Sequence, residues 1–377
     1  MRVTKYNIAE KDCTLEGFDF ENVELLRYFL SSAAKADIKQ AKALAKDFSK
    51  RLKHLIVVGV GGSILGARSI IEAFGAKNVH FCGNSLDFSQ FNDILKNLEN
   101  ENYGICYISK SGTTIESSLF FELVCDSTSK ENVVVISDQN SPAHKLASKK
   151  GFHFLEIPQT IGGRFSTMTA VGAFPIFFAG INFDKIFNGY IHEIKTFLKN
   201  KNQSEELCYA GARASEEAKG KRVEVFASFE NFYQKLLPVF VQLVGESLGK
   251  NGKGLYPTSS NFTEDLHAVG QYLQEGRKSF VETIICSKKH KNSSKIAKKY
   301  QKINNIALNS TIEAHKKAGN SIVKIELEGQ DEKSVGMLLA FMQLAVIVSG
   351  FLTNTNPFGQ NGVEAYKNNM RKMLNAQ

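Results

Sequence analysis

The run His54-Leu-Ile-Val-Val-Gly-Val60 leads directly into the glycine-rich turn Gly61-Gly62-Ser63. A short, nearly continuous apolar run that is rich in β-branched residues is typical of a strand buried on both faces of a parallel sheet. The stretch after the turn, residues 64–75, has the spacing of a helix. The order of strand, glycine-rich turn and helix therefore predicts a parallel α/β unit, in which ligands bind at the carboxyl ends of the strands.

This alternation continues along the chain and recurs in a second unit. Further strands of the first unit are predicted at 78–82, 104–109, 132–137 and 153–157, with helices near 86–98, 114–126 and 141–149. A helical stretch, roughly 168–220, is followed by predicted strands at 222–227, 280–286 and 321–326 and by helices at 229–248, 265–274 and 335–352. Five strands with crossover helices predict a doubly wound α/β sandwich, and the second unit looks like its duplication at the level of the fold.

These patterns divide the chain into four expected parts. Residues 1–52 form an N-terminal segment, irregular at first and helical from residue 21, that packs on the core. Residues 53–190 form the first α/β domain and residues 191–352 the second, both with mainly parallel sheets. Residues 353–377 form a C-terminal loop and helix that close the site.

Composition and charge narrow the class of protein. Of the 377 residues, 43% are hydrophobic and 23% are charged, and the formal net charge is +9. A basic balance fits a nucleic-acid binder or an enzyme that acts on anionic metabolites. The densest basic run, Lys288-Lys-His-Lys291, lies in a polar segment and is interpreted as a solvated helix face. No zinc-finger, helix-turn-helix or RNA-binding signature accompanies it, so we expect no nucleic-acid partner.

The six cysteines are scattered, with no Cys-x-x-Cys pair. Cys82 and Cys106 lie in predicted strands, where we expect buried and inert thiols. The N-terminus lacks an apolar signal core, and no run reaches about 18 continuous apolar residues. We therefore expect a reducing cytoplasm as the location and no membrane partner.

The turn Gly59-Val-Gly61-Gly62-Ser63 is a candidate phosphate or sugar cradle, because backbone N–H groups at the start of a helix attract anions. It fails the dinucleotide fingerprint at Ile64, and no Gly-Lys-Ser/Thr is present for a nucleoside triphosphate. The glycines are equally compatible with a tight turn and close helix packing alone.

Hydroxyl groups crowd the segment Ser109-Lys110-Ser111-Gly112-Thr113-Thr114, which follows a predicted central strand and begins a helix. Hydroxyl donors, free amides and a helix N-terminus together suit a phosphomonoester dianion. The alternative is a hydroxyl-rich helix cap, with Glu116 as an acid of the first turn. A cap needs only one such hydroxyl, so the composition favours phosphate binding.

Further polar candidates come from each of the two predicted domains. The turn Gly162-Gly163-Arg164 presents an arginine that would stabilise negative charge on a carbonyl or enediolate; pairing with a surface carboxylate is an equally good interpretation. Gln242 and Glu246 lie four residues apart on one face of the helix predicted at 229–248. A carboxylate at the end of a buried helix is costly unless it is used, and the alternative is a solvated last turn capped by Gly249.

Two further candidates lie nearer the C-terminus. His267, in Asp265-Leu-His267, is near a predicted helix start and has the chemistry of an acid or base at neutral pH, although a lone histidine is more often structural. Lys367 lies on the first turns of the closing helix, roughly 362–375, after the polar loop Asn356-Pro-Phe-Gly-Gln360. Taken alone, Lys367 is equally a surface lysine.

Together these segments resemble the phosphoglucose isomerase family, over about residues 53–370. The most specific motifs are Gly162-Gly-Arg-Phe-Ser166 with Ala170-Val-Gly172, and Asn356-Pro-Phe-x-Gln-x-Gly-Val-Glu-x-x-Lys367. The resemblance implies two sugar-isomerase (SIS-type) α/β domains and a cofactor-free, metal-free isomerisation of glucose 6-phosphate and fructose 6-phosphate through a cis-enediol. It also implies an obligate homodimer with shared sites.

The resemblance also assigns roles to matching positions. Glu246 matches the base that moves a proton between C1 and C2, Arg164 matches the group that faces the enediolate, and Lys110 matches a phosphate contact made chiefly through its backbone. Lys367 and His267, the latter from the neighbouring subunit, match the residues that assist ring opening. The other matches are to substrate contacts: Gly62, Ser63, Ser109, Ser111, Thr114, Gln242 and Gln360.

The sequence departs from larger family members in two ways. It is short, so peripheral helices and arms are expected to be trimmed, and its phosphate loop has Ser111-Gly112 where larger members often have Thr-Phe. A non-catalytic sugar-phosphate sensor on the same scaffold would keep this loop but would not need all four candidate catalytic residues, which favours an enzyme. Isomerisation of mannose 6-phosphate, found in a related branch, stays open.

Overall fold

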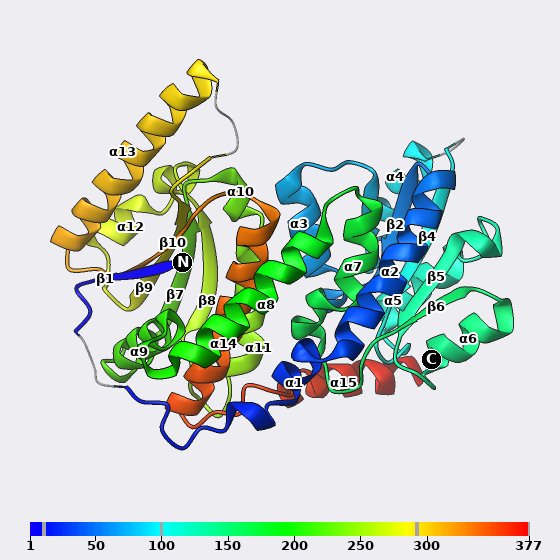
Figure 1. Ribbon diagram of the computed structural model, residues 1–377, viewed down its shortest axis with the longest axis horizontal. Helices are drawn as coiled ribbons and strands as arrows, with labels where there is room; N and C mark the ends of the chain where they lie inside the picture. Colours follow the sequence, from blue (N-terminus) through cyan, green and yellow to red (C-terminus); the bar gives the residue numbers. More distant parts are fainter. Residues whose placement is uncertain (10–12, 99–100, 291–293, 376–377) are drawn as a thin grey trace.

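The computed structural model of the chain describes residues 1–9, 13–98, 101–290 and 294–375 (Figure 1). Within these residues the chain forms two five-stranded sheets, and helices cover each of them. The sheets lie on opposite sides of the view in Figure 1, with long helices between them. The predicted α/β fold class with mainly parallel sheets is confirmed.

The first sheet is entirely parallel and has the order β3-β2-β4-β5-β6. Its strands match the five predicted runs: β2 (His54–Val58), β3 (Val79–Cys82), β4 (Tyr103–Ile108), β5 (Val133–Ser137) and β6 (His153–Glu156). Leu55 and Val57 face one core, whereas Ile56 and Val58 face another, because successive residues of a strand point to opposite sides. Burial on both faces explains why β2 is a continuous apolar run.

Helices form a layer on each face of the first sheet. One layer consists of α2 (Ser32–Arg51), α3 (Leu65–Phe74) and α7 (Ala170–Phe178), and the other of α4 (Phe88–Asn97), α5 (Ile115–Val124) and α6 (Pro142–Lys150). The short α1 (Glu24–Leu30) precedes α2. Ser31 caps α2 by accepting the N–H of Ala34, and Ile38 and Phe48 lie on its buried stripe.

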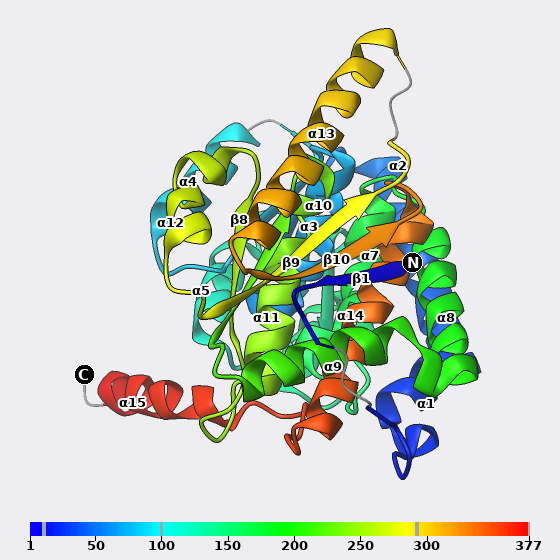
Figure 2. The same cartoon turned by 90° about the vertical axis from the view of Figure 1, so that its left-hand side faces the viewer.

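The second sheet has the order β1-β10-β9-β7-β8, and only β1 runs antiparallel to its neighbour. Its strands are β1 (Arg2–Tyr6), β7 (Val223–Ser228), β8 (Tyr256–Asn261), β9 (Phe280–Ser287) and β10 (Ser321–Leu327). One face packs against α9 (Glu205–Ala218), α11 (Leu237–Leu248) and α14 (Glu332–Leu352), and the other against α12 (Gly270–Glu275) and α13 (Lys295–Lys317). Figure 2 shows α13 extending beyond the sheet that it covers.

The helices α8 (Phe183–Asn200) and α14 pack along each other between the two sheets (Figure 1). Their buried residues belong to one continuous core that reaches the inner faces of both sheets, so the two halves are held in one arrangement. The length and apolar composition of α14 alone would suit a membrane-spanning helix. Most of its residues are instead buried inside the protein, as in a core helix.

Two strands depart from the sequence prediction, and both lie at edges of the second sheet. The N-terminal residues, expected to be irregular, contain β1, which pairs with β10. The other missed strand, β8, has the polar sequence Tyr-Pro-Thr-Ser-Ser-Asn. An edge strand keeps one side in solvent and tolerates a proline such as Pro257, so neither strand carries the apolar signal by which the others were recognised.

Several helices are divided more finely than predicted. The stretch 168–220 forms α7, α8 and α9. The helix expected over 229–248 is two helices, α10 (Asn231–Gln234) and α11. Pro238 lacks an N–H and is best tolerated in the first turn of a helix, which is where α11 places it. The helix expected over 265–274 is a 3₁₀ turn, Glu264–His267, followed by the shorter α12.

The basic run is only partly on a helix. Lys288 and Lys289 follow β9 and precede any helix, whereas Lys295, Lys298 and Lys299 lie on α13, whose full extent was not predicted. Residue 291 of the predicted run lies outside the described residues. The expectation of a solvated helix face is therefore confirmed for the second half of this basic segment and wrong for its beginning.

Two carboxyl groups face each other in the layer between the sheets. Glu193 of α8 and Glu206 of α9 are both buried, and each is close enough to affect the pKa of the other. Burial, and then repulsion from Glu193, raises the pKa of Glu206 to about 9. Within the described residues, one oxygen of Glu206 has no hydrogen-bond partner. The folded pair therefore keeps at neutral pH a proton that the unfolded chain has already released.

This pair predicts a pH dependence of stability. Between a pH of about 4.5 and a pH of about 9, the folded chain binds a proton that the unfolded chain lacks, so stability falls as the pH rises through this window. Glu206→Gln removes the titrating group, and its melting temperature should exceed that of the wild type by a few degrees at pH 8, about 2–4 °C for each kcal/mol. The two melting temperatures should converge near pH 5.

Differential scanning calorimetry from pH 5 to pH 9 measures this difference. Glu313→Gln, at a side chain of α13 that is 57% exposed, is the control and should follow the wild type throughout. A difference between Glu206→Gln and the wild type that does not change with pH would contradict the proposed protonation of the pair.

Candidate active site

The largest group of predicted site residues surrounds a cavity of about 790 Å³. It lies where the loops after β2, β4 and β5 meet the end of α11 and the C-terminal segment, that is, at the carboxyl ends of parallel strands. The predicted residues that line it are Gly62, Ser63, Lys110, Ser111, Thr114, Arg164, Gln242, Glu246, Gln360 and Lys367. Segments more than 300 residues apart along the chain thus meet at one site.

The first glycine-rich turn is packed directly against the second. A Cβ atom on Gly62 would lie 2.3 Å from the carbonyl carbon of Gly163, so only glycine allows the two loops to touch. Gly61 has a positive φ of 55°, which glycine adopts without strain. Gly62 is therefore required for packing between the two loops, and Gly61, Gly62 and Ser63 also line the cavity, so the role of the turn as a phosphate or sugar cradle stays a prediction.

The hydroxyl-rich loop after β4 turns back on itself before α5 begins. The N–H of Gly112 donates to Ser109 Oγ at 3.1 Å, and the hydroxyls of Ser111 and Thr113 are 2.9 Å apart. Thr114 is the N-cap residue of α5, yet its side chain makes no capping hydrogen bond. The hydroxyl of Thr114 is therefore not used as a cap, and Thr114 lines the cavity.

Lys110 directs its ammonium group toward the next loop. Its Nζ donates to the carbonyls of Gln159 at 2.6 Å and Ile161 at 3.0 Å. Burial lowers the pKa of Lys110, and the nearby Asp138 partly opposes this effect. The side chain thus joins the loop after β4 to the segment that leads to Arg164.

Arg164 is the most completely bonded side chain of the site and is only 3% exposed. Its Nε donates to Ser247 Oγ at 2.7 Å, and its Nη2 donates to the carbonyls of Pro357 at 2.6 Å and Gly359 at 3.0 Å. Its Nη1 donates to Gln360 Oε1 at 3.1 Å and approaches the Glu246 carboxylate at 3.4 Å. Pairing with a surface carboxylate is therefore wrong, because the carboxylate it meets lies in the cavity.

Gln242 and Glu246 lie on one face of α11, as their spacing predicted. Gln242 Nε2 donates to Glu246 Oε1 at 2.8 Å, and Arg164 Nη1 lies near Oε2. The Glu246 side chain is 26% exposed and lines the cavity, so it is not a frayed, solvated last turn. Burial lowers the pKa of Arg164, and the charge of Glu246 opposes this change.

The C-terminal segment closes the remaining side of the cavity. Gln360 precedes a 3₁₀ turn (Asn361–Val363), and α15 (Glu364–Asn375) follows, close to the helix predicted for this region. Lys367 lines the cavity from the first turns of α15, and its Nζ donates to Glu364 Oε1 at 3.1 Å. Lys367 is therefore a cavity residue that remains 35% exposed.

The sequence match now decides the family. A family model for phosphoglucose isomerase matches residues 39–270, which is more than half of the chain. The chain belongs to the phosphoglucose isomerase family.

Curated relatives and a solved structure agree with this assignment. The chain is 37% identical to the glucose-6-phosphate isomerase of Mycoplasma capricolum, over 90% of the chain and 87% of the relative. It is 35% identical to that of Mycoplasmopsis pulmonis, over 99% of the chain and 94% of the relative. The fold also matches a crystal structure of a glucose-6-phosphate isomerase from Chlamydia trachomatis, with a TM-score of 0.80, 20% identity and coverage of 96% of this chain and 80% of the other.

Two residues that the family resemblance selected do not line the cavity. Ser109 is buried, and its hydroxyl accepts the N–H of Gly112 within the loop. His267 ends the 3₁₀ turn before α12 and is exposed. The direct contact of Ser109 with phosphate and the contribution of His267 from a neighbouring subunit both stay predictions.

The structure adds cavity residues that sequence reasoning did not select. Glu116, Asp138 and Tyr366 line the cavity of this phosphoglucose isomerase family member, as do residues 139–141 after β5. Their positions in the sequence could have identified them, because each follows a predicted strand or adjoins a recognised motif. Within the described residues, no group of three or more histidine, cysteine or carboxylate side chains is placed to hold a metal ion.

The contact between the two glycine-rich turns predicts an asymmetric response to alanine. Gly62→Ala forces the loops apart, because its Cβ would lie 2.3 Å from a backbone atom, and overpacking of this kind costs about 1–3 kcal/mol. Gly163→Ala is the matched control, since its Cβ would have 3.9 Å to the nearest atom. Thermal unfolding should show a lower melting temperature for Gly62→Ala alone. Equal melting temperatures for the two variants would show that the loops are not in contact.

Proposed function

We propose that the chain catalyses the isomerisation of D-glucose 6-phosphate and D-fructose 6-phosphate through a cis-enediol, in glycolysis and gluconeogenesis, without a cofactor. The observation that carries the proposal is the pairing of Glu246 with Arg164. A carboxylate able to accept a proton and a buried cation able to stabilise the resulting charge line one cavity, 3.4 Å apart. The family assignment and the names of the relatives support the same reaction.

The loop after β4 is proposed to hold the phosphate group. Ser111, Thr114 and the backbone of Lys110 lie at the start of α5, where hydroxyls, amides and the helix dipole favour a dianion. Ser109 would support this loop through its bond to Gly112. Binding at the remote phosphate fixes C1 and C2 of the sugar relative to the catalytic groups, which converts binding energy into orientation.

Glu246 is proposed to carry the proton between C1 and C2. The two carbons are adjacent, so one carboxylate can serve both, and Gln242 and Arg164 each orient one of its oxygens. A guanidinium has five N–H donors, and the contact of Arg164 to Glu246 is the longest of those it makes. When Glu246 takes the proton, its negative charge passes to the enediolate, and this donor of Arg164 is released to meet it.

Ring opening is assigned to the side of the cavity that faces α15. Lys367 and Gln360 line that side, and Gly62 and Ser63 lie at the first turn as proposed sugar contacts. His267 would complete the acid–base pair for ring opening, because an imidazole titrates near neutral pH. Its exposed position outside the cavity supports donation from a second subunit.

A homodimer with shared sites follows from the position of His267. Apolar side chains are exposed next to it: Val269 is 42% exposed and Tyr272 is 54% exposed. A second chain would cover such a surface.

All six cysteines are free thiols, which supports the expected reducing cytoplasm as the location. The division into domains that begin at residues 53 and 191, with a C-terminal segment from residue 353, is also part of the proposal.

The reaction is tested by a coupled assay in the presence of EDTA. Fructose 6-phosphate is supplied, and the glucose 6-phosphate that forms is detected with a coupling dehydrogenase. Mannose 6-phosphate is tested as a substrate in parallel. Turnover of fructose 6-phosphate supports the proposal, and turnover of both sugars would extend it to a dual specificity. A folded protein that binds the sugar phosphate without turnover would instead be the sugar-phosphate sensor.

In the same assay, Glu246→Gln should lower kcat by about 10³-fold, because the amide cannot accept the proton, while KM stays near that of the wild type. Glu72→Gln, at an exposed residue of α3 outside the cavity, should leave both constants unchanged. Retained turnover in Glu246→Gln would remove this residue as the base.

Mixed dimers test the origin of His267. Glu246→Gln and His267→Ala chains are each expected to be inactive, but a mixed dimer has one site with both native residues if His267 acts across the interface. Random exchange of subunits between equal amounts of the two variants makes half of the dimers mixed. Each mixed dimer has one of its two sites intact, so about a quarter of the wild-type activity should return. No recovery, when mass spectrometry shows subunit exchange, would place His267 in its own subunit.

A further inference from the structure

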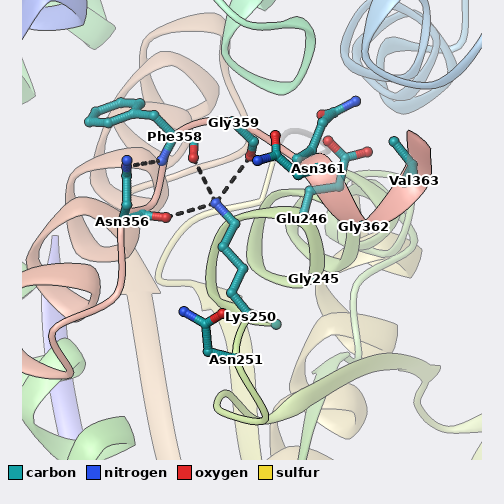
Figure 3. Close-up of a pocket in the computed structure, with 12 residues that line it drawn as sticks. Gly245, Glu246, Lys250, Asn251, Asn356, Phe358, Gly359, Asn361, Gly362 and Val363 are labelled. Carbon is teal, nitrogen blue, oxygen red and sulfur yellow. Dashed lines mark hydrogen bonds between the residues drawn. The ribbon is translucent and has the colours of Figure 1, made fainter. Parts of the chain in front are cut away.

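A second cavity lies beside the proposed sugar cavity and shares residues with it. It has a volume of about 720 Å³ and is lined by the end of α11 and by the C-terminal segment (Figure 3). Residues 356–363, here called the strap, run between the two cavities: Gly359, Gln360 and Val363 line both. None of residues 356–374 is buried, so apolar packing does little to fix the position of the strap.

Lys250 instead fixes the position of the strap with its three N–H donors. It lies two residues beyond the end of α11, and its Nζ donates to the carbonyls of Asn356 and Phe358 at 2.7 Å each and of Gly359 at 3.1 Å. Figure 3 shows its side chain reaching from the end of α11 to this row of carbonyls. An ammonium group has three donors, so Lys250 is saturated by one short stretch of backbone.

Arg164 binds the same stretch from the other side. Its Nη2 donates to the carbonyls of Pro357 and Gly359, so Gly359 accepts from two cations. Hydrogen bonds from charged donors are about twice as strong as neutral ones. The two cations therefore lie close together at the carbonyl of Gly359. Burial, and then the charge of Arg164, lowers the pKa of Lys250, and Glu246 opposes this change.

We propose that Lys250 is a positioning residue of the reaction: by clamping the carbonyls of residues 356–359 it holds Gln360 and Lys367 at the sugar cavity. This inference rests on the isomerase function proposed above. Lys250 lines the second cavity but not the sugar cavity, so its effect passes through the strap rather than through contact with the substrate. A shift of about 1 Å in a catalytic group can lower a rate by about 10²-fold.

The test compares Lys250→Met, which keeps the length of the side chain, with the wild type in the coupled assay. We expect kcat to fall by about 10- to 100-fold with KM within about threefold, because the phosphate loop is untouched. Lys250→Arg restores donors and charge and should recover most of the loss. Lys253→Met is the matched control: its Nζ donates to the carbonyl of Thr353, before the strap, and both constants should stay unchanged.

Hydrogen exchange provides a second readout that does not depend on turnover. Amides of residues 358–367 should exchange faster in Lys250→Met than in Lys253→Met or the wild type. If Lys250→Met does not fold, Lys250→Gln, which keeps two N–H donors, replaces it under the same criteria.

Each outcome decides between the two proposals. A kcat of Lys250→Met within twofold of the wild type, or a raised KM at unchanged kcat, would overturn the positioning role of Lys250. A wild-type protein without turnover would overturn the isomerase function itself, whatever the exchange rates of the strap.

Discussion

A single buried guanidinium joins the three parts of this site. Every N–H donor of Arg164 is bonded: to the hydroxyl and carboxylate at the end of α11, and to side-chain and backbone oxygens of the strap. A buried cation that loses such partners costs several kcal/mol, so few arrangements of these segments are compatible with it. The loop after β6, the helix of Glu246 and the strap are therefore fixed together by one charge.

Arg164 also connects the packed core of the protein to the segments that carry the proposed catalytic groups. The inner faces of both sheets share one core through α8 and α14, which holds the proposed phosphate loop of one sheet and the Glu246 helix of the other at a set separation. Lys250 and Arg164 then bind the strap by its carbonyls, although the strap itself is exposed. Rigid packing places the proposed proton acceptor, and polar anchors place the groups proposed for ring opening.

The sequence predicted those parts of the fold in which burial leaves a pattern. The inner strands β2, β4 and β5 of the first sheet are buried along almost their whole length and were recognised. The edge strands β3 and β6 are only partly buried but still carry short apolar runs, whereas the edge strands β1 and β8 of the second sheet carry none. The cavity was predicted largely from motifs at strand ends. The clamp by Lys250 could not be predicted, because its partners are backbone carbonyls about a hundred residues away, and a carbonyl has no residue identity.

The most direct test of the account is solvent isotope incorporation, followed by NMR in D₂O. If Glu246 carries the proton through an enediolate, fructose 6-phosphate should yield glucose 6-phosphate with deuterium at C2 in a substantial fraction of turnovers, because a carboxylic acid exchanges its proton with solvent. Complete absence of deuterium at C2, even after many reversible turnovers at equilibrium, would indicate direct hydride transfer between C1 and C2. That result would contradict the roles given to Glu246 and Arg164.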